Sequence, residues 1–593
     1  MLSSFSYAET FVNRHRRMVP AAGVISGLFC ALFLLWACQV WSPPAFCLFW
    51  GICFVCAVRG LCARPSRREG LACGVLGTVF CFFTLGQNAM AGTMQFDLSF
   101  LAFWVLLSAL CFPILLGLCR FLAHLPAADS PTAPAGPLWR QLALYTGIIL
   151  VLWLPVFLCW GPVRLDVDSV QLLEQAFHGG LNDAHPILYT LLLRLILWPF
   201  YKLGLMELGA YLFGFLQMTA VAAMLAYSLV WMRRRGAGLI AVGLGFALFG
   251  GCTMYAFQSL VVWKDPLFNG VLLLYCLFLF DTARCKGENL RQKGPLIHFV
   301  MLTLLLCFLR GNGWPIAAVV CLALCALRPA RRRILTVLLP VLIGVKLITG
   351  PVYGALGLQS TLTAEAWAVP LQQVAYVAAS EPEAFSPQQA ETIGRVIPVE
   401  AMAQSYSSIT VDPVKTSSEF NAEHFATLQG KLDLLSVWAQ LLPGHWQSYL
   451  KAWLAEVAGY VSPRFDGGSY SFPYEGSNGA FGITSKDIVL GLTGWAGLRD
   501  ELEARAVFIP PALMAWGLLL CGVVQLLRRR ARLLLAYLPL YLVWFGLVVG
   551  APNYMQIRYL LAFAYFIPCA LFTLLAPVGA AKVGIDEKAA SIV

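Results

Sequence analysis

Long apolar runs recur along most of this chain, and they constrain its fold more than any other feature. A run of about 17 to 25 apolar residues is long enough to cross the hydrocarbon core of a bilayer as a helix. Hydrophobic residues make up 59% of the 593 residues and charged residues 12%, whereas soluble domains carry about 25% charged residues. This composition excludes an ordinary soluble protein and predicts an all-α polytopic membrane protein.

The runs also predict how many times the chain crosses the membrane. Spans are expected near 18–41, 44–63, 70–91, 97–122, 140–160, 236–256, 262–281, 295–310, 313–328, 333–351, 506–527, 532–550 and 557–579. The region 186–232 is apolar as well, and it can cross once after a half-buried segment or three times. We therefore expect a bundle of about 13 to 15 transmembrane helices.

Basic residues gather in short connectors, and their positions set the orientation. The clusters are NRHRR at 13–17, RPSRR at 64–68, RRR at 233–235, RPARRR at 328–333 and RRRAR at 528–532. Short loops rich in Lys and Arg stay in the cytoplasm, and one orientation satisfies every cluster if 186–232 crosses an odd number of times. The net charge of +11 thus reflects topology. Binding of nucleic acid is the weaker interpretation, and no nucleic acid is expected as a partner.

The same orientation places residues 352–505 outside the cytoplasm. This segment holds 16 acidic and 8 basic residues and no cysteine, so a disulfide framework is not expected there. Helical patterns, including a Ser386 cap followed by Pro387, predict a mainly helical extracytoplasmic domain. The expected divisions are 1–139 (four spans and a connector), 140–351 (a catalytic membrane module with an outer loop at 161–185), 352–505 (the extracytoplasmic domain) and 506–593 (the last spans and a cytoplasmic tail).

The outer loop carries an unusual density of ionisable groups, in the stretch RLDVDSVQLLEQAFHGGLNDAHPILY at 164–189. Asp168 and Gln171 have the spacing of a capping box, and Gly179-Gly180 would end a helix of about ten residues. One face of that helix is apolar, so it could lie on the membrane surface. In the plainest interpretation Asp168 only caps this helix and Asp166 is only solvated.

Charged groups at other helix ends favour a different interpretation. Lys264 and Asp265 stand at the outer entrance of one span, and Arg310 and Arg558 at the outer ends of two others. A charge at the centre of the bilayer costs about 2.5–3.5 kcal/mol on insertion scales, and less near the interface. A local ion pair could explain the first two residues, and headgroup anchoring could explain the arginines. Together, however, they predict a shared polar cavity on the outer side.

Acidic and basic groups in one outer cavity suit group transfer from a lipid phosphate. A loop carboxylate can take the proton of an attacking hydroxyl, and Lys or Arg can stabilise the charge that grows on a departing phosphate. Because nucleotide sugars are absent outside the cytoplasm, an activated sugar would have to reach this cavity on a lipid carrier.

The motifs and their order resemble the GT-C superfamily of membrane glycosyltransferases, and most closely a poorly characterised bacterial subfamily. The resemblance covers about 140–575. The motifs that carry it are Asp168-Ser169, His185-Pro186 with Tyr189-Thr190, Trp263-Lys264-Asp265, Arg310 with Asn312 and Gly313, Pro370 to Gln373, Tyr406 to Lys415, and Pro552 with Arg558-Tyr559. The first four spans lie outside it.

The resemblance implies a GT-C-like bundle that transfers a sugar from a polyprenyl-phosphate donor to an extracytoplasmic glycan, lipid or protein. It implies Asp168 as the catalytic base, with Asp166 as the second candidate. It further implies that the donor phosphate or the substrate meets Lys264, Asp265, Arg310, Arg558, His185 and Asp183, and that the outer domain presents Gln372, Gln373, Asp412 and Lys415. No metal or other cofactor is expected. The implied location is the bacterial inner membrane, among membrane lipids, with the site on the periplasmic side.

Other classes remain open from sequence. A transporter or flippase of lipid-linked sugars is the main alternative, and an oligosaccharide ligase or polymerase is a third. Transporters often show internal repeats and helices broken at mid-membrane. Neither is clear in this chain, and the large outer segment also favours an enzyme.

Overall fold

The computed structural model describes residues 18–62, 64–90, 95–125, 136–182, 185–358, 365–463, 479–506, 509–550 and 556–576. Regular structure within these ranges is helical, apart from an isolated β-bridge between Arg164 and Val261. Ten helices there are long and apolar enough to cross a membrane, and a bent pair would make an eleventh. The chain is an all-α polytopic membrane protein.

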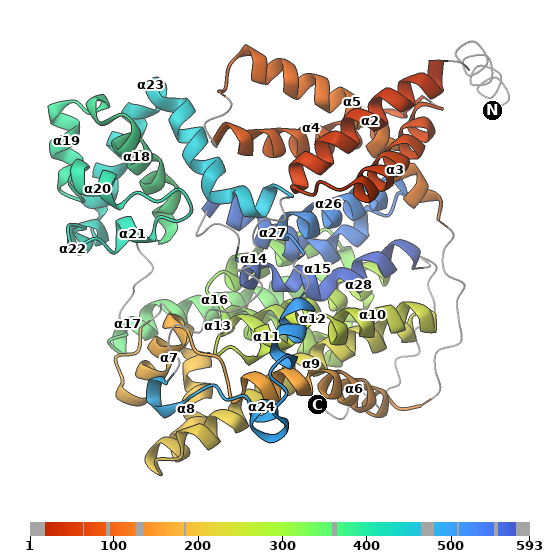
Figure 1. Ribbon diagram of the computed structural model, residues 1–593. Coiled ribbons are helices and arrows are strands. Elements are labelled where there is room, and N and C mark those ends of the chain that lie inside the picture. The colour runs from red at the N-terminus through yellow and green to blue at the C-terminus, as the bar shows by residue number, and fades with distance from the viewer. Residues whose placement is uncertain are drawn as a thin grey trace.

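The candidate spans pack side by side as one bundle (Figure 1). They are α2 (Met18–Cys38), α3 (Pro43–Leu61), α4 (Arg67–Met90), α5 (Leu98–His124), α6 (Leu138–Trp160), α9 (Met206–Arg234), α12 (Asp265–Arg284), the continuous stretch Arg328–Ala355 that contains α15 to α17, α27 (Leu534–Gly550) and α28 (Leu561–Leu575) with the short turns that precede the last two. The bent pair is α10 (Leu239–Gly251) with α11 (Met254–Leu260), at 54°. Three apolar helices are shorter than the ten: α13 (Lys293–Leu309), α14 (Gly313–Leu324) and α26 (Pro511–Leu527).

The region 186–232, whose crossing number the sequence left open, holds two helices. α8 (Ile187–Lys202) has 16 residues, and α9 has 29 and is the one that meets the length of a span. This arrangement corresponds to one long crossing preceded by a shorter segment. The shorter helix packs against both α9 and the loop helix α7 (Val167–His178).

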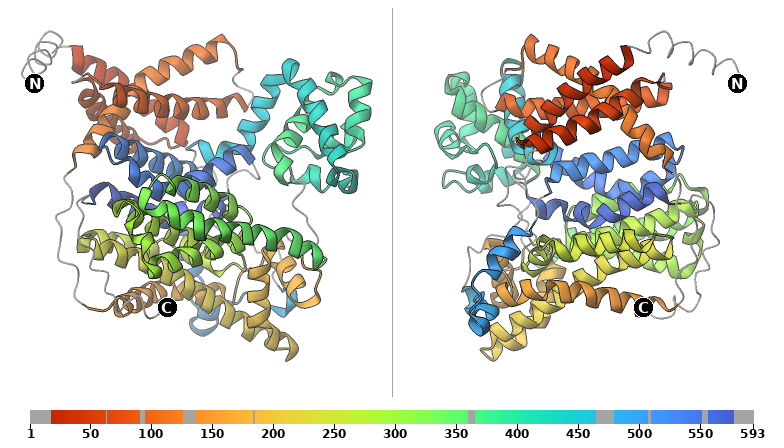
Figure 2. Two further views of the ribbon diagram at one scale, coloured as in Figure 1. Left: turned by 180° about the vertical axis from the view of Figure 1, so that it is seen from behind. Right: turned by 45° about the vertical axis from the view of Figure 1, so that its right-hand side comes forward.

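Several basic clusters gather at one end of the bundle, where they contact the ends of helices. Arg235 donates to Asp281 at the end of α12 at 2.7 Å. Arg528 donates to the carbonyls of Leu122 and Ala123 in the last turn of α5, at 2.7 and 3.0 Å. Arg528 thus pairs with carbonyls that α5 leaves without helical partners at its C-terminus, whereas Arg235 pairs with a carboxylate. α7 and the domain that contains α18 to α22 lie at the opposite end of the spans (Figures 1 and 2).

A small domain projects beside the bundle at that opposite end (Figure 1). It consists of α18 (Ala368–Ser380), α19 (Pro387–Gly394), α20 (Val399–Ser405), α21 (Asp412–Lys415), α22 (Ala422–Ala426) and the first half of α23 (Leu428–Val461). Its apolar core is separate from that of the spans and includes Leu371, Val374, Met402 and Val437. The predicted cap of α19 is confirmed, because Ser386 and Gln389 form a reciprocal capping box.

The long helix α23 joins the small domain to the bundle. It bends at His445, whose φ of −124° is not helical, and its second half packs against α4, α26 and α27. Three indole groups hold it there: Trp453 donates to Val548, and Trp516 and Trp544 donate to the last carbonyls of α23, at 2.7 to 2.9 Å. Residues 352–505 are therefore not one separate body in the structure.

The end of that segment also lies on the bundle. α24 (Ile488–Thr493) packs against α6, and α25 (Leu498–Ala504) follows it. Arg499 donates through Nε to the carbonyl of Cys159 at 3.0 Å and pairs with Asp487 at the same distance. The segment 479–506 thus covers the end of α6, next to the start of the outer loop.

Candidate active site

A two-stranded bridge fixes the start of the outer loop. The amide of Arg164 donates to Leu260 at 3.1 Å, and the amide of Val262 donates to Arg164 at 3.2 Å. This pairing runs in parallel and sets the loop directly beside the segment that leads into α12. The bridge explains how residues almost 100 positions apart in sequence come to share one site.

A buried glutamine of α9 forms hydrogen bonds to the segment that makes this bridge. Gln217 of α9 donates to the carbonyls of Ser259 and Val261 at 2.8 and 2.6 Å, and it accepts a hydrogen bond from Tyr189 at 2.7 Å. The segment between α11 and α12 cannot pair its own carbonyls within a helix, so a side-chain donor has to satisfy them. A hydrogen-bonded buried network of this kind makes the base of the site rigid.

The N-cap of α7 is Asp166, and the predicted capping role of Asp168 is wrong. Asp166 accepts from the backbone and the hydroxyl of Ser169, both at 3.1 Å, and Ser169 accepts in return from the backbone of Asp166. Trp263 donates a third hydrogen bond to the same oxygen of Asp166 at 2.7 Å. The pair 166 and 169 satisfies a capping box as well as 168 and 171 do, and the backbone stays extended from the bridge at Arg164 through Asp166, after which the helix begins.

The apolar face of α7 packs into the protein. Leu173 and Phe177 are buried in a small apolar cluster with Tyr189 and Val262. The expectation that this helix lies on the membrane surface is therefore wrong, because its apolar residues already have protein partners. Its end is as predicted: Gly179 and Gly180 have φ of 90° and 74°, which favour glycine.

Asp168 does not cap α7, and its side chain contacts the start of the last span. Its carboxylate accepts from Nη1 of Arg558 at 2.7 Å. Asn269 of α12 holds this arginine in place, because its amide donates to the carbonyl of Arg558 and its oxygen accepts from the amide of Ala562, both at 3.0 Å. The loop, α12 and the start of α28 therefore meet at one point.

A second ion pair lies beside the first. Arg310, the residue that ends α13, donates to Asp265 at 2.5 Å, and only 1% of Asp265 is exposed. The guanidinium groups of Arg310 and Arg558 both stack on the ring of Tyr559, at 4.8 and 4.9 Å from its centroid. Stacking on an aromatic face suits the planar guanidinium and would not suit lysine equally well.

Lys264 is the cation of the cluster without a carboxylate at ion-pair distance among the described residues. Its Nζ donates to Nδ1 of His185 at 3.3 Å, and Nε2 of His185 contacts Oε1 of Gln171 at 3.0 Å. A ring nitrogen that accepts from an ammonium group carries no proton, so His185 is neutral with its proton on Nε2. Lys264 thus retains donor capacity for a bound anion.

The pKa values within the loop follow from these contacts. Burial raises the pKa of Asp166, and the neighbouring Asp168 raises it further. Burial also acts against ionised Asp168, but Arg558 and Lys264 outweigh it and leave the pKa of Asp168 below its usual value. Burial and Lys264 lower the pKa of His185 to about 4, and burial lowers the pKa of Lys264 despite Asp265 and Asp168. Asp168 is therefore ionised at neutral pH.

We call these groups the charged cluster: Asp166, Asp168, His185, Lys264, Asp265, Arg310 and Arg558. It contains three carboxyl groups, three basic side chains and the neutral His185. The arrangement offers an ionised carboxylate with one oxygen outside the arginine contact, next to an ammonium group that has no carboxylate partner within the described ranges. Such a pair can accept a proton and bind an oxyanion at the same place.

The remaining predicted residues lie elsewhere. Gln372 donates to the carbonyl of Ser407, and Gln373 bridges the carbonyl of Tyr449 and the indole of Trp438, so both amides bond within the small domain. Asp412 and Lys415 pair with each other at 2.8 Å, one helical turn apart. Asp183 falls outside the described residues. Within those residues, no group of three or more His, Cys, Asp or Glu side chains is placed to hold a metal ion.

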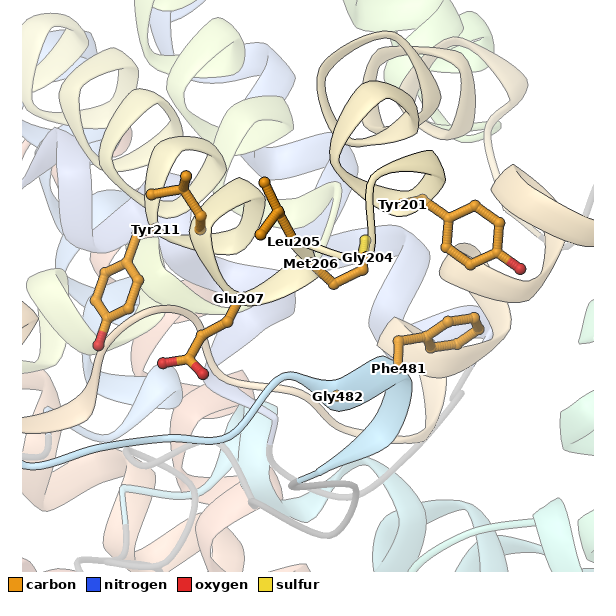
Figure 3. Close-up of a pocket in the computed structure, with 9 residues that line it drawn as sticks. Tyr201, Gly204, Leu205, Met206, Glu207, Tyr211, Phe481 and Gly482 are labelled. Atoms are coloured by element: carbon orange, nitrogen blue, oxygen red, sulfur yellow. The ribbon is translucent and has the colours of Figure 1, made fainter.

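An open pocket lies apart from the charged cluster, at the corner between α8 and α9. Figure 3 shows Glu207 and Tyr211 on one side of it and Tyr201 and Phe481 on the other. The ring of Phe177 stacks on Tyr201 at 4.4 Å and meets Phe481 edge-on at 5.6 Å, so the end of α7 forms part of the wall behind the pocket. None of the residues predicted for the site lines it.

Comparisons with known proteins identify a family but no activity. The model of a family described as a family of unknown function, DUF6020, matches residues 176–587. The matched range includes Lys264, Arg310 and Arg558, and it begins ten residues after Asp166. No curated protein and no solved structure matches the chain.

Proposed function

We propose that this chain, which belongs to the DUF6020 family of unknown function, is a membrane glycosyltransferase. It transfers a sugar from a polyprenyl-phosphate carrier to a hydroxyl group of an acceptor. The observation that carries the proposal is the meeting of ionised Asp168 with Lys264 and Arg558 in one buried cluster at the end of the spans. These groups come from three distant parts of the chain, and an ion pair needed only for stability would not require a lysine beside it that has no carboxylate at ion-pair distance in the described structure.

Asp168 is the general base of the proposed reaction. The acceptor oxygen attacks the anomeric carbon of the donor sugar, and its proton passes to the carboxylate of Asp168. The bond between the anomeric carbon and the phosphate oxygen breaks, and the electron pair leaves with polyprenyl phosphate. Arg558 keeps Asp168 ionised and oriented through the 2.7 Å hydrogen bond, while the second carboxylate oxygen receives the proton.

Lys264 binds the phosphate of the carrier. Its ammonium group has no carboxylate partner at ion-pair distance among the described residues, and its contact with neutral His185 leaves other N–H bonds for phosphate oxygens. Arg310 is paired with Asp265 and contributes positive potential without contacting the phosphate itself. As the departing phosphate gains charge, a fixed cation in a dry environment stabilises it more strongly than water would.

The cluster lies at the end of the bundle opposite the basic clusters that we have described. With the positive-inside rule, this arrangement supports a location on the periplasmic side of a bacterial inner membrane. A lipid carrier would then enter from the outer leaflet. The small domain lies on the same side and is suited to select the acceptor.

The test is donor cleavage by the full chain in nanodiscs. Purified protein is incubated with a panel of polyprenyl-phosphate monosaccharides, and free polyprenyl phosphate is measured by mass spectrometry. At least one donor should be cleaved by the wild type and not by Asp168→Asn. If the wild type moves intact lipid-linked sugar between leaflets of proteoliposomes and cleaves none, the protein is a flippase and the proposal is wrong.

A further inference from the structure

One buried carboxyl group outside the charged cluster lacks a hydrogen-bond partner among the residues that the structure describes. Glu456 of α23 is completely buried, and neither of its oxygens is paired within the described part of the chain. α23 is not among the candidate spans. An isolated carboxylate of this kind is costly unless it is neutral or a ligand pairs with it. Burial raises the pKa of Glu456 well above its usual value, although Lys415 acts in the opposite direction, so burial favours the neutral carboxyl.

The position of Glu456 on α23 relates it to the charged cluster. Tyr460 follows four residues later, so the two side chains share one face of the helix about 6 Å apart along its axis. The hydroxyl of Tyr460 accepts from the backbone of Gln556 at 3.1 Å, two residues before Arg558. Tyr460, one helical turn from Glu456, thus contacts the segment that supplies the last arginine of the site.

On its other side, Glu456 faces a segment of the small domain. The charges of Lys415 and Asp412 act on its carboxyl, and Glu456 in turn acts on Tyr406. All three residues belong to the pattern Y-x-x-I-x-DPVK at 406–415. Val411, Val414 and Tyr406 also pack in one apolar cluster with Tyr449 of α23. We call the region between α23 and residues 406–415 the seam.

A second unpaired acceptor lies against the same segment. Gln372 of α18 is fully buried, its amide nitrogen donates to Ser407 at 2.5 Å, and its Oε1 has no partner among the described residues. Three unsatisfied oxygens on two side chains beside one ten-residue segment are unusual, because buried polar atoms nearly always find partners. Gln372 lacks a donor, and a neutral Glu456 carboxyl lacks both a donor and an acceptor.

We propose that the seam binds a hydroxyl-rich ligand, a sugar or polyol, whose hydroxyl groups pair with Glu456 and Gln372. A neutral carboxyl both donates and accepts, as a sugar hydroxyl does, and an amide oxygen accepts. The ordered pair Asp412–Lys415 supplies further polar groups at the edge of the seam. The inference rests on the proposed function: the ligand is the acceptor, held near Tyr460, whose hydroxyl bonds to the segment that supplies Arg558.

Binding of soluble oligosaccharides tests the seam without any donor. The full chain in nanodiscs is titrated with maltotetraose, chitotetraose and mannotetraose, and tryptophan fluorescence is followed, because Trp453 lies three residues before Glu456. At least one oligosaccharide should bind the wild type saturably. Glu456→Leu should weaken that binding about tenfold or more, and Glu456→Gln, which keeps an acceptor oxygen, should weaken it less.

Two controls separate binding from folding. Glu503→Gln changes an exposed glutamate of α25 and should bind as the wild type does. Replacing a buried unpaired carboxyl with leucine is not expected to unfold the protein, so Glu456→Leu should melt at or above the wild-type temperature. If Glu456→Leu melts below the wild-type temperature, oligosaccharide affinity is measured in Glu456→Gln and in Gln372→Leu instead. Wild-type affinity in both of these variants overturns the inference.

The outcomes also distinguish this inference from the proposed function. The seam is not a ligand site if the wild type and a stably folded Glu456→Leu bind the oligosaccharide equally well, or if the wild type binds none. Neither result bears on donor cleavage. Absence of donor cleavage by the wild type overturns the glycosyltransferase instead.

Discussion

The carboxylate of Asp168 accepts a hydrogen bond from Arg558 at 2.7 Å, across 390 residues of sequence. One partner lies in the first turn of the loop helix α7, and the other lies in the turn that opens the last span. Asn269 of α12 bonds to the backbone on both sides of that turn. The contact therefore depends on the correct docking of three elements, and it keeps the base of the proposed reaction ionised.

Asp168→Asn is expected to lower sugar transfer by about a hundredfold to ten-thousandfold, the usual contribution of a general base. Asparagine keeps the shape and still accepts from Arg558, so expression and donor binding should stay close to wild type. Initial rates and donor affinity measured in nanodiscs check both points. Asp166→Asn is the matched variant: if it is inactive while Asp168→Asn is active, Asp166 is the base, and activity in both excludes a loop base altogether.

Asp166→Ala should destabilise α7, whereas Asp166→Asn should not. Loss of an N-cap costs about 1 kcal/mol, and alanine also removes the acceptor of the Trp263 indole. Asparagine is a good N-cap and can still accept from the indole. Thermal melting of the two variants, with tryptophan emission as a second signal, should separate them. Equal melting temperatures would show that the capping box of α7 contributes nothing measurable.

Arg310→Ala should lower the stability of the protein, whereas Lys264→Gln should lower its affinity for the donor. Removal of Arg310 leaves Asp265 buried without its partner, which costs about 3–5 kcal/mol in comparable buried pairs. Lys264→Gln removes a buried cation that has no carboxylate at ion-pair distance in the described structure, so the protein should fold and bind the donor weakly. The measurements are melting temperature and donor affinity for each variant. Asp265→Asn added to Arg310→Ala should recover part of the lost stability.

His185 should make the protein less stable in mild acid. Its pKa is about 4 in the folded protein and about 6.5 when unfolded, so the unfolded chain binds more protons between these values. Stability from this residue is complete above about pH 6.5 and is lost as pH falls towards 4, by about 3 kcal/mol at most. Melting temperatures at pH 4.5 and 7.5 test this, and His185→Gln should show a smaller difference. An unchanged difference would assign the acid sensitivity to other groups.

The small domain should lie outside the cytoplasm. Gln388→Cys on the exposed surface of α19 is expected to react with a membrane-impermeant maleimide on intact spheroplasts. The native Cys285, exposed just after the end of α12 at the opposite end of the bundle, should react only after permeabilisation. The reverse pattern would invert the topology and place the charged cluster on the cytoplasmic side, where a lipid-linked donor is not required.

The sequence predicts which charged residues lie close together. Each of them stands at the end of a helix, and the positive-inside rule assigns each helix end to one side of the membrane. Lys264, Arg310 and Arg558 all follow this logic, and the structure brings them together with the loop. The partner of each residue could not be predicted. Asp265 pairs with Arg310 and not with its neighbour Lys264, since packing of α12 against α13 sets that contact.

Glu456 shows a different limit. In the sequence it is one acidic residue within an amphipathic pattern, LKAWLAEVAGYV, where a glutamate normally faces water. Only the docking of α23 between the small domain and α4, α26 and α27 buries it. Similarly, two capping boxes were available to α7, and the distant bridge to Val261 selected Asp166. The burial of Glu456 and the choice of N-cap both depend on packing between distant segments, which a local sequence pattern does not contain.

The packing of α4 and α5 has a consequence for biosynthesis. These helices leave the ribosome early, yet they pack against α23 and α26, which are translated more than 300 residues later. The four N-terminal helices must therefore wait in the bilayer as an inserted but incomplete unit, in line with membrane proteins that insert first and associate afterwards. Final assembly of this protein can begin only when its last third has been synthesised.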